Sequence, residues 1–165
     1  MAHRHRWLIG AGVVLALAAA LALTTPGGQE SVAAPGQTRI YVDADAQGPT
    51  HDGSTWDFAF TELQDALGMA GPGDQIWVAA GTYTPTWLFD EADPRSATFQ
   101  MENGVAIYGG FDPTIGDIAW EDRDWVNHET ILSGDLNGDD VPPFGNNDEN
   151  SYHVLYHPDT IALDS

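Results

Sequence analysis

The sequence predicts an all-β fold, a solenoid of short parallel strands that begins with a short capping α-helix. Apolar, β-rich segments begin at Ile76, Val105, Thr130 and Tyr152, at intervals of about 20 to 30 residues. Recurrence at that period is typical of repeat proteins, in which each unit buries its apolar face against its neighbour. The segment 76–80 is apolar at every position, as expected of a parallel strand covered on both faces.

The elements before that strand are a strand and a helix. The alternating segment 38–42 predicts the strand, and a turn-rich segment follows it. In the helix, Thr61 and Gln64 have the spacing of a capping box, and the Gly-Pro-Gly run at 71–73 ends the helical pattern. Four residues at helical spacing form one apolar face: Phe60, Leu63, Leu67 and Ala70. We expect this helix to seal the open end of the solenoid from water.

Residues 1–34 are predicted to be a signal peptide with a short linker. A basic start at residues 3–6 precedes an uncharged apolar run from Trp7 to Leu23, and small residues follow. A retained membrane anchor is the alternative, because the run approaches the roughly 20 residues that span a bilayer. Both interpretations predict that the rest of the chain is exported, to the medium or to the cell surface.

The composition fits an exported domain and excludes several classes of partner. The formal net charge is −20, because 25 acidic residues face only five arginines and the chain has no lysine. Such a surface repels nucleic acid and anionic membranes, whose binding needs clustered basic side chains. The absence of cysteine excludes disulfides and thiolate metal sites. A hydrophobic content of 42% indicates a folded domain despite the charge, and we assign residues 38–165 to it.

Several motifs together carry a family resemblance. They are YVDADA at 41–46, W-x-x-A-F-x-x-L-Q-x-A-L at 56–67, GDQIWVAAGTY at 73–83, NGVAIYGGF at 103–111, RDW at 123–125, TILSGDLNGDD at 130–140 and NSYHVLYH at 150–157. The region after Thr38 resembles the N-terminal cap and first coils of bacterial secreted right-handed parallel β-helix proteins of the pectate-lyase-like superfamily. The resemblance implies a right-handed parallel β-helix that is incomplete at its C-terminal end. It also implies that any catalytic residues lie on later coils, so no catalytic residue is predicted here.

One loop has the residue pattern of a calcium site. Its candidate ligands are Asp135, Asn137, Asp139 and Asp140. Alternate oxygen-bearing residues can converge on one hard cation when a loop curls. However, Asp140 stands where a helix–loop–helix calcium site needs glycine, and Asn146 stands where it needs a bidentate glutamate. Two interpretations stay open: a looser calcium site completed by Asp148 or Asn147, or a loop rich in residues that tolerate turns.

Aromatic residues provide the candidate carbohydrate contacts. Trp77 lies in the apolar strand and is predicted to be in the core, whereas Trp87 and Trp120 lie in predicted loops. An exposed indole ring can stack on a sugar ring, so Trp87 and Trp120 are the candidate stacking residues.

Three functions are consistent with these observations. The first is an exported β-helix module with a structural, adhesive or carbohydrate-interacting role. The second is the N-terminal part of an extracellular polysaccharide lyase or glycoside hydrolase whose active site lies outside this chain. The third is a calcium-dependent carbohydrate-binding module. The expected partner is an extracellular polysaccharide or cell-surface glycan, not nucleic acid, and calcium is the single candidate cofactor. A membrane is a partner only if the signal segment is retained.

Overall fold

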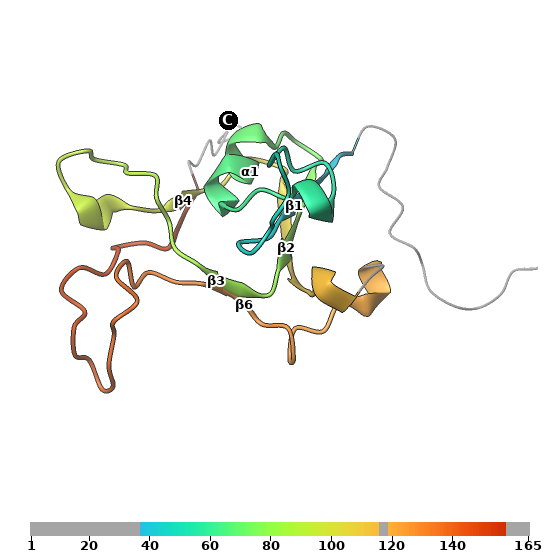
Figure 1. Ribbon diagram of the computed structural model, residues 1–165. Coiled ribbons are helices and arrows are strands. Elements are labelled where there is room, and N and C mark those ends of the chain that lie inside the picture. The colour runs from blue at the N-terminus through green and yellow to red at the C-terminus, as the bar shows by residue number, and fades with distance from the viewer. Residues whose placement is uncertain (1–36, 116–118, 158–165) are drawn as a thin grey trace, which may run out of the picture.

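Residues 37–115 and 119–157 are described by the computed structural model (Figure 1). Within them every paired strand runs parallel to its neighbour. The first sheet has the order β1 (Arg39–Val42), β2 (Gln75–Ala79), β5 (Ala106–Phe111). Two smaller sheets pair β3 (Gly81–Tyr83) with β6 (Thr130–Leu132), and β4 (Phe99–Gln100) with β7 (Leu155–Tyr156). The single α-helix of the described residues is α1 (Leu63–Met69).

The prediction of a parallel β-helix is wrong. In a solenoid, the four recurring apolar segments would stack as successive strands of one sheet. In the structure they are divided among three sheets: β2 and β5 share the first, whereas β6 and β7 pair with β3 and β4. Each sheet of the described residues has only two or three short strands, and the fold is a small mixed α/β domain. The apolar recurrence therefore marks strands but not a repeating unit, and of the four strands only β2 is buried along its whole length.

The strand predicted from the apolar run is the centre of the first sheet. All five residues of β2 are buried, which confirms a strand covered on both faces. Ile76 pairs with Ile40 of β1 on one side and Ile107 of β5 on the other. Because side chains alternate along a strand, Ile76 and Val78 face the aliphatic core while Trp77 faces the opposite side.

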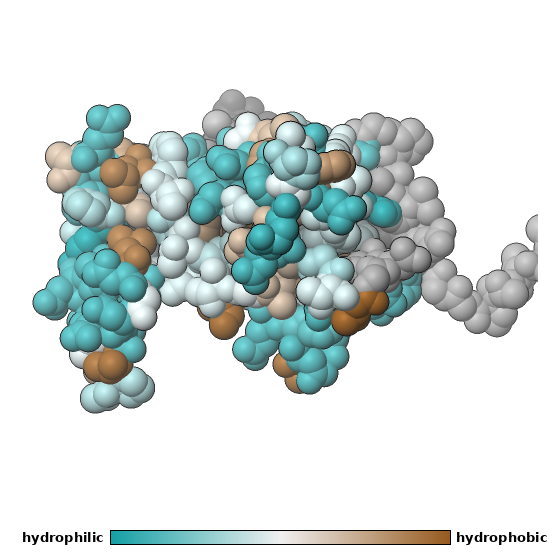
Figure 2. Space-filling view, in the orientation of Figure 1, coloured by the Kyte–Doolittle hydropathy of each residue, from teal (hydrophilic) through white to brown (hydrophobic). Residues whose placement is uncertain are grey.

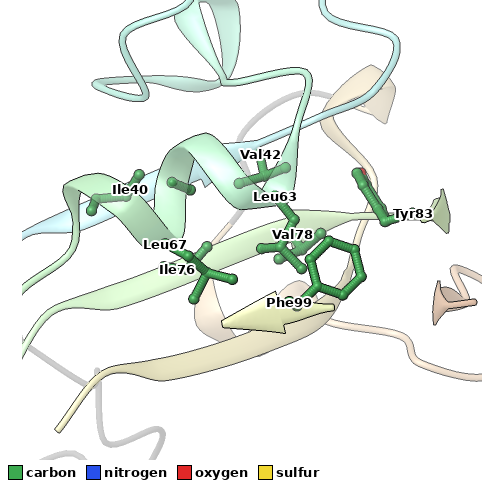
Figure 3. Close-up of a cluster of buried hydrophobic side chains, with 9 residues drawn as sticks. Ile40, Val42, Leu63, Leu67, Ile76, Val78, Tyr83 and Phe99 are labelled. Carbon is green, nitrogen blue, oxygen red and sulfur yellow. The ribbon is translucent and has the colours of Figure 1, made fainter. Parts of the chain in front are cut away.

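Helix α1 covers one face of the first sheet and packs beside β4 (Figure 3). Leu63 and Leu67 are 1% exposed, so the predicted apolar face of the helix is confirmed. The predicted capping box is wrong, because the helix begins after Glu62 and has no side-chain cap. The backbone N–H of Gln100 in β4 donates to Oε1 of Gln64 instead, at 3.4 Å. The side chain that would have capped the helix therefore contacts a strand.

The other face of the first sheet carries an aromatic layer. Trp77 stacks on Phe111 with 4.5 Å between ring centroids and an angle of 12° between the planes. Trp56 and Tyr41 extend the layer at its edge, with 4.9 Å between their centroids. Trp77 is 1% exposed, which confirms its predicted place in the core.

One threonine joins the first sheet to the second. The Thr130 hydroxyl donates to the Ala79 carbonyl at 3.0 Å and accepts from the backbone N–H of Gly110 at 3.0 Å. A Cβ on Gly109 would lie 2.6 Å from the Thr130 Cβ, so this approach requires glycine. The hydroxyl thereby satisfies backbone groups of β2 and β5 at the point where β6 meets them.

Hydrophilic residues cover most of the face seen in Figure 2, and hydrophobic residues occur on it as separate spots. The predicted signal segment, residues 1–34, lies outside the described residues. Among the residues that are described, no helix is both long and apolar enough to span a bilayer.

Candidate functional site

Two loops on the same side of the sheets form the candidate site (Figure 1). The first loop connects β3 to β4, and the second connects β6 to β7. A mostly apolar pocket of about 360 Å³ lies where they meet. Its lining residues are Phe89, Arg95, Ser96, Thr98, Tyr152, His153 and Tyr156.

The wall from the first loop is built on local hydrogen bonds. The Asp93 carboxylate accepts from the backbone N–H of Arg95 at 3.0 Å and caps the short 3₁₀ turn Pro94–Ser96. The Ser96 hydroxyl contacts the Asp93 and Asp90 carbonyls at 2.7 and 2.9 Å, and it accepts from the backbone N–H of Asp90. These bonds fix the loop's shape, so the wall is formed before any ligand binds.

Arg95 connects this wall to the second loop. Its carbonyl accepts from the backbone N–H of Tyr152 at 2.9 Å. Its Nε donates to the Asn150 carbonyl at 2.8 Å. Its guanidinium lies 4.5 Å from the centre of the Tyr152 ring. Two of these contacts are with Tyr152 and one is with Asn150, so Arg95 holds the segment that carries Tyr152 against the first loop.

Aromatic rings line the open side of the pocket. Phe89 is 66% exposed and Tyr152 is 54% exposed. The Phe89 and Tyr156 ring centroids are 5.5 Å apart, with the planes tilted by 58°. Tyr156 is held by the pairing of β7 with β4, where its carbonyl accepts from the backbone N–H of Met101 at 2.8 Å. The described part of the pocket lining contains no acidic side chain.

A group of carboxylates lies in the second loop. Oxygen atoms of Asp135, Asp140 and Glu149 all lie within 4.8 Å of one another. Asp135 also accepts backbone N–H groups of Gly138, Asp139 and Asp140, at 2.6, 3.1 and 3.0 Å. These bonds, led by that from Asp140, hold the pKa of Asp135 below its usual value, so the carboxylate stays charged. Oε1 of Glu149 is buried and has no hydrogen-bond partner.

Asn150 joins the carboxylate group to the aromatic pocket. Its side-chain Nδ2 donates to Asp140 at 2.9 Å, and its carbonyl accepts from Arg95. The carboxylate group and the pocket therefore share the segment 149–153.

The structure brings together half of the predicted calcium ligands. Asp135 and Asp140 meet, and Glu149 joins them rather than Asp148 or Asn147. Asp139 contributes its backbone N–H to Asp135, and its carbonyl accepts from Nδ2 of Asn146 at 3.0 Å. Asn137 is an exposed loop residue. Glu149 follows Asp148 directly, so it lay one residue beyond the sequence prediction.

The two candidate stacking residues have different environments. The Trp87 ring contacts Phe89 with 6.3 Å between centroids, which places it beside the aromatic pocket. The Trp120 ring packs against Tyr108 at 4.6 Å, and the Arg123 guanidinium lies 4.5 Å from its centre. Trp120 is therefore occupied by contacts within the protein. The pocket residues Tyr152 and Tyr156 were not predicted.

Comparison with protein-family models, curated proteins and solved structures found no match to this chain.

Proposed function

We propose that this chain is an exported module that binds a neutral carbohydrate in the aromatic pocket. The observation that carries the proposal is the preformed, open pocket whose exposed rim consists of Phe89, Tyr152 and Tyr156. Binding pockets for small ligands combine apolar and aromatic walls with a few fixed polar groups. Here the CH face of a sugar ring would lie against the aromatic rings, and its hydroxyls would meet the guanidinium of Arg95 beside them.

The charge of the chain favours a neutral sugar over an acidic one. The chain has a formal net charge of −20, which disfavours the binding of polyanions. Arg95 is the sole arginine in the described lining, and its Nε already donates to Asn150. The lining also gives no support to glycoside hydrolysis, which needs a pair of carboxyl groups across the scissile bond. Binding without cleavage is therefore the function that this pocket supports best.

Affinity electrophoresis tests the proposal. The purified domain is run in gels that contain a soluble neutral polysaccharide, either a β-glucan, a xylan or a mannan. We expect at least one of these to retard the protein, and a Phe89→Ala, Tyr156→Ala double variant to migrate freely. Phe144→Ala is the matched control, since Phe144 is 86% exposed and lies outside the pocket. The carbohydrate proposal fails if none of the three polysaccharides retards the protein, or if the control loses binding equally.

Export has its own test. N-terminal sequencing of protein recovered from the culture medium should give a start after the Ala22 to Ala34 region if the signal peptide is cleaved. Protein that keeps Met1 and stays with the membrane would instead indicate an anchor. Recovery in the cytosol alone would contradict export.

We also propose that Ca²⁺ binds the carboxylate group and stabilises the pocket wall. Oxygen ligands are what Ca²⁺ prefers, and the carboxyl groups of Asp135, Asp140 and Glu149 are close enough to share one ion. An ion there would hold segment 149–153, which carries Tyr152. The sequence prediction named Asn137 and Asp139 together with Asp135 and Asp140, whereas this proposal has Glu149 as the third ligand.

A calcium titration of the melting temperature tests this second proposal. Glu149→Gln is the better probe, because Asp135 also accepts three backbone hydrogen bonds and its loss would disturb the loop directly. We expect a saturable rise with Ca²⁺ that Glu149→Gln removes and the neighbouring control Asp148→Asn keeps. An equal rise with Mg²⁺ at the same ionic strength would reduce the effect to screening of the net charge and contradict the proposal.

A further inference from the structure

A second pocket, separate from the aromatic one, lies at the junction of β5 and β6. It has a volume of about 550 Å³, and the described linings of the two pockets have no residue in common. The two strands contribute Gly109, Gly110, Thr130 and Ile131, and the segment that connects them contributes Arg123, Trp125 and Glu129. The lining therefore combines a basic and an acidic side chain with apolar surface.

Backbone hydrogen bonds hold the connecting segment against the two strands. The backbone N–H of Asp124 donates to the Gly110 carbonyl at 2.8 Å, and the backbone N–H of Gly110 donates to the Thr130 hydroxyl at 3.0 Å. Gly110 has a φ of 88°, and a Cβ there would lie 3.0 Å from the backbone nitrogen of Trp125. Glycine therefore allows the turn that carries Trp125 to pack on β5, and the pocket exists before any ligand binds.

Arg123 is held in place by groups that do not neutralise it. Its Nε donates to the Gly109 carbonyl at 2.8 Å, and its guanidinium lies 4.5 Å from the centre of the Trp120 ring. The flanking carboxylates bind backbone instead. Asp122 accepts a backbone N–H at 2.9 Å, and Asp124 accepts two at 3.0 and 3.1 Å. Among the described residues, Arg123 forms no ion pair with a carboxylate.

An arginine without an acidic partner is unexpected in this chain, which has 25 acidic residues and five arginines. The Nε bond to Gly109 fixes the plane of the guanidinium of Arg123 and leaves its Nη groups as donors. Such a planar pair of donors matches the two oxygens of a carboxylate. The pocket therefore has a fixed group that can bind the carboxylate of a ligand.

Glu129 gives the same pocket a group of opposite charge. It lies at the start of β6, where its carbonyl accepts from the backbone N–H of Gly81 at 2.9 Å, and its side chain is exposed. A purely anionic ligand would be opposed both by Glu129 and by the net charge of −20. A neutral sugar would use neither charge of the lining. A zwitterion has no net charge and can contact Arg123 with its carboxylate and Glu129 with its ammonium group.

Exposed apolar side chains complete the pocket. Trp125 is 68% exposed and Ile131 is 46% exposed, and they come from the turn and from β6. They offer a surface on which a small apolar group of a ligand can be buried. A volume of about 550 Å³ lies within the range of small-molecule pockets, roughly 300–1,000 Å³.

We propose that this second pocket binds a free α-amino acid with an apolar side chain. Arg123 holds the carboxylate of the ligand and Glu129 holds its ammonium group. The apolar side chain of the ligand lies against Trp125 and Ile131. This proposal does not depend on carbohydrate binding, because it concerns a different pocket and a different class of ligand.

Isothermal titration with three amino acids tests the proposal. The probes are L-leucine, L-methionine and L-phenylalanine, each at about 0.15 M salt to screen the net charge. We expect saturable one-to-one binding of at least one probe. The absence of saturable binding by all three would overturn the proposal.

Analogues of the tightest probe separate a zwitterion site from an apolar or an anion site. One analogue lacks the carboxyl group and the other lacks the amino group. Each loses a hydrogen-bonded charged group, so each should bind about tenfold more weakly or worse. An analogue that binds as tightly as the amino acid itself would contradict the assignment of its missing group.

Variants at exposed positions locate the binding in this pocket without disturbing the core. Glu129→Gln should weaken binding of the amino acid about tenfold, and Glu121→Gln is its control, an exposed glutamate outside the described lining. Trp125→Ala should also weaken binding, whereas Val126→Ala should not, since Val126 is 71% exposed and lies outside the lining. Equal affinities in each variant and its control would overturn the proposal.

Discussion

Replacing Leu67 by alanine tests the packing of α1 on the first sheet. Leu67 is 1% exposed and belongs to the buried cluster shared by α1, β1, β2 and β4 (Figure 3). Truncating such a leucine removes its transfer free energy and leaves a cavity, which together cost about 2–5 kcal/mol. At about 3–4 °C per kcal/mol for a domain of this size, a cost near 3 kcal/mol lowers the melting temperature by roughly 10 °C.

Urea denaturation measures the loss directly, and a neighbour on the same helix gives the control. Met69 is 57% exposed, so Met69→Ala should change the free energy of unfolding by less than about 1 kcal/mol. If Leu67→Ala unfolds the protein completely, Ile76→Val removes one methylene from the same cluster and should cost about 0.5–1.5 kcal/mol. Equal losses in Leu67→Ala and Met69→Ala would refute the assignment of the buried helix face.

Two further predictions concern buried hydroxyl groups. Thr130→Val should lower the free energy of unfolding by about 1–3 kcal/mol, because the backbone N–H of Gly110 loses its acceptor. Thr82→Val, at an exposed position on the paired strand β3, should leave the free energy of unfolding unchanged. Equal urea midpoints for the two variants would contradict this role of Thr130. Burial raises the pKa of Tyr83 from 10.0 to about 12, so the stability that its neutral form contributes is present below about pH 10 and is lost as the pH rises through 12. The loss of stability between about pH 8 and pH 11 should therefore be smaller in Tyr83→Phe than in the parent, and an identical loss would contradict the assignment.

Local patterns predicted the elements that lie in the core. The unbroken apolar run around Ile76 predicted a buried strand, and the spacing of Leu63 and Leu67 predicted the buried face of a helix. Both signals are local, since one strand or one helix turn contains them. The capping box failed because Gln64 contacts β4, a partner about 36 residues away along the chain. A tertiary contact therefore replaced the local hydrogen bond that the sequence spacing predicted.

The arrangement of the sheets was not predictable from the same signals. An apolar segment indicates that a strand forms, but not which strand pairs with it. The segments at Thr130 and Tyr152 resemble those at Ile76 and Val105, yet they pair with β3 and β4. Those two partners are only three and two residues long and have no apolar run of their own. Pairing between strands far apart in sequence is the step that periodicity does not specify.

The candidate site was predicted only where its residues are close in sequence. Asp135, Asn137, Asp139 and Asp140 belong to one loop, and the alternation of the first three pointed to a cation site. The aromatic pocket combines Phe89 and Arg95 with Tyr152 and Tyr156, which are roughly 60 residues away along the chain and meet only because β7 pairs with β4. No local pattern joins them. Trp120 shows the opposite error, since its predicted loop position did not reveal its contacts with Tyr108 and Arg123.

Calorimetric titration measures whether the aromatic pocket binds a neutral carbohydrate. The ligand is a neutral oligosaccharide prepared from whichever polysaccharide retards the domain in gels, and the quantity compared is its dissociation constant. We predict saturable binding by the parent chain, at least a tenfold loss in Phe89→Ala with Tyr156→Ala, and no change in Phe144→Ala. Removing two stacking rings at about 1 kcal/mol or more each accounts for a loss of that size. Equal affinity in the parent and the double variant would contradict carbohydrate binding at this pocket.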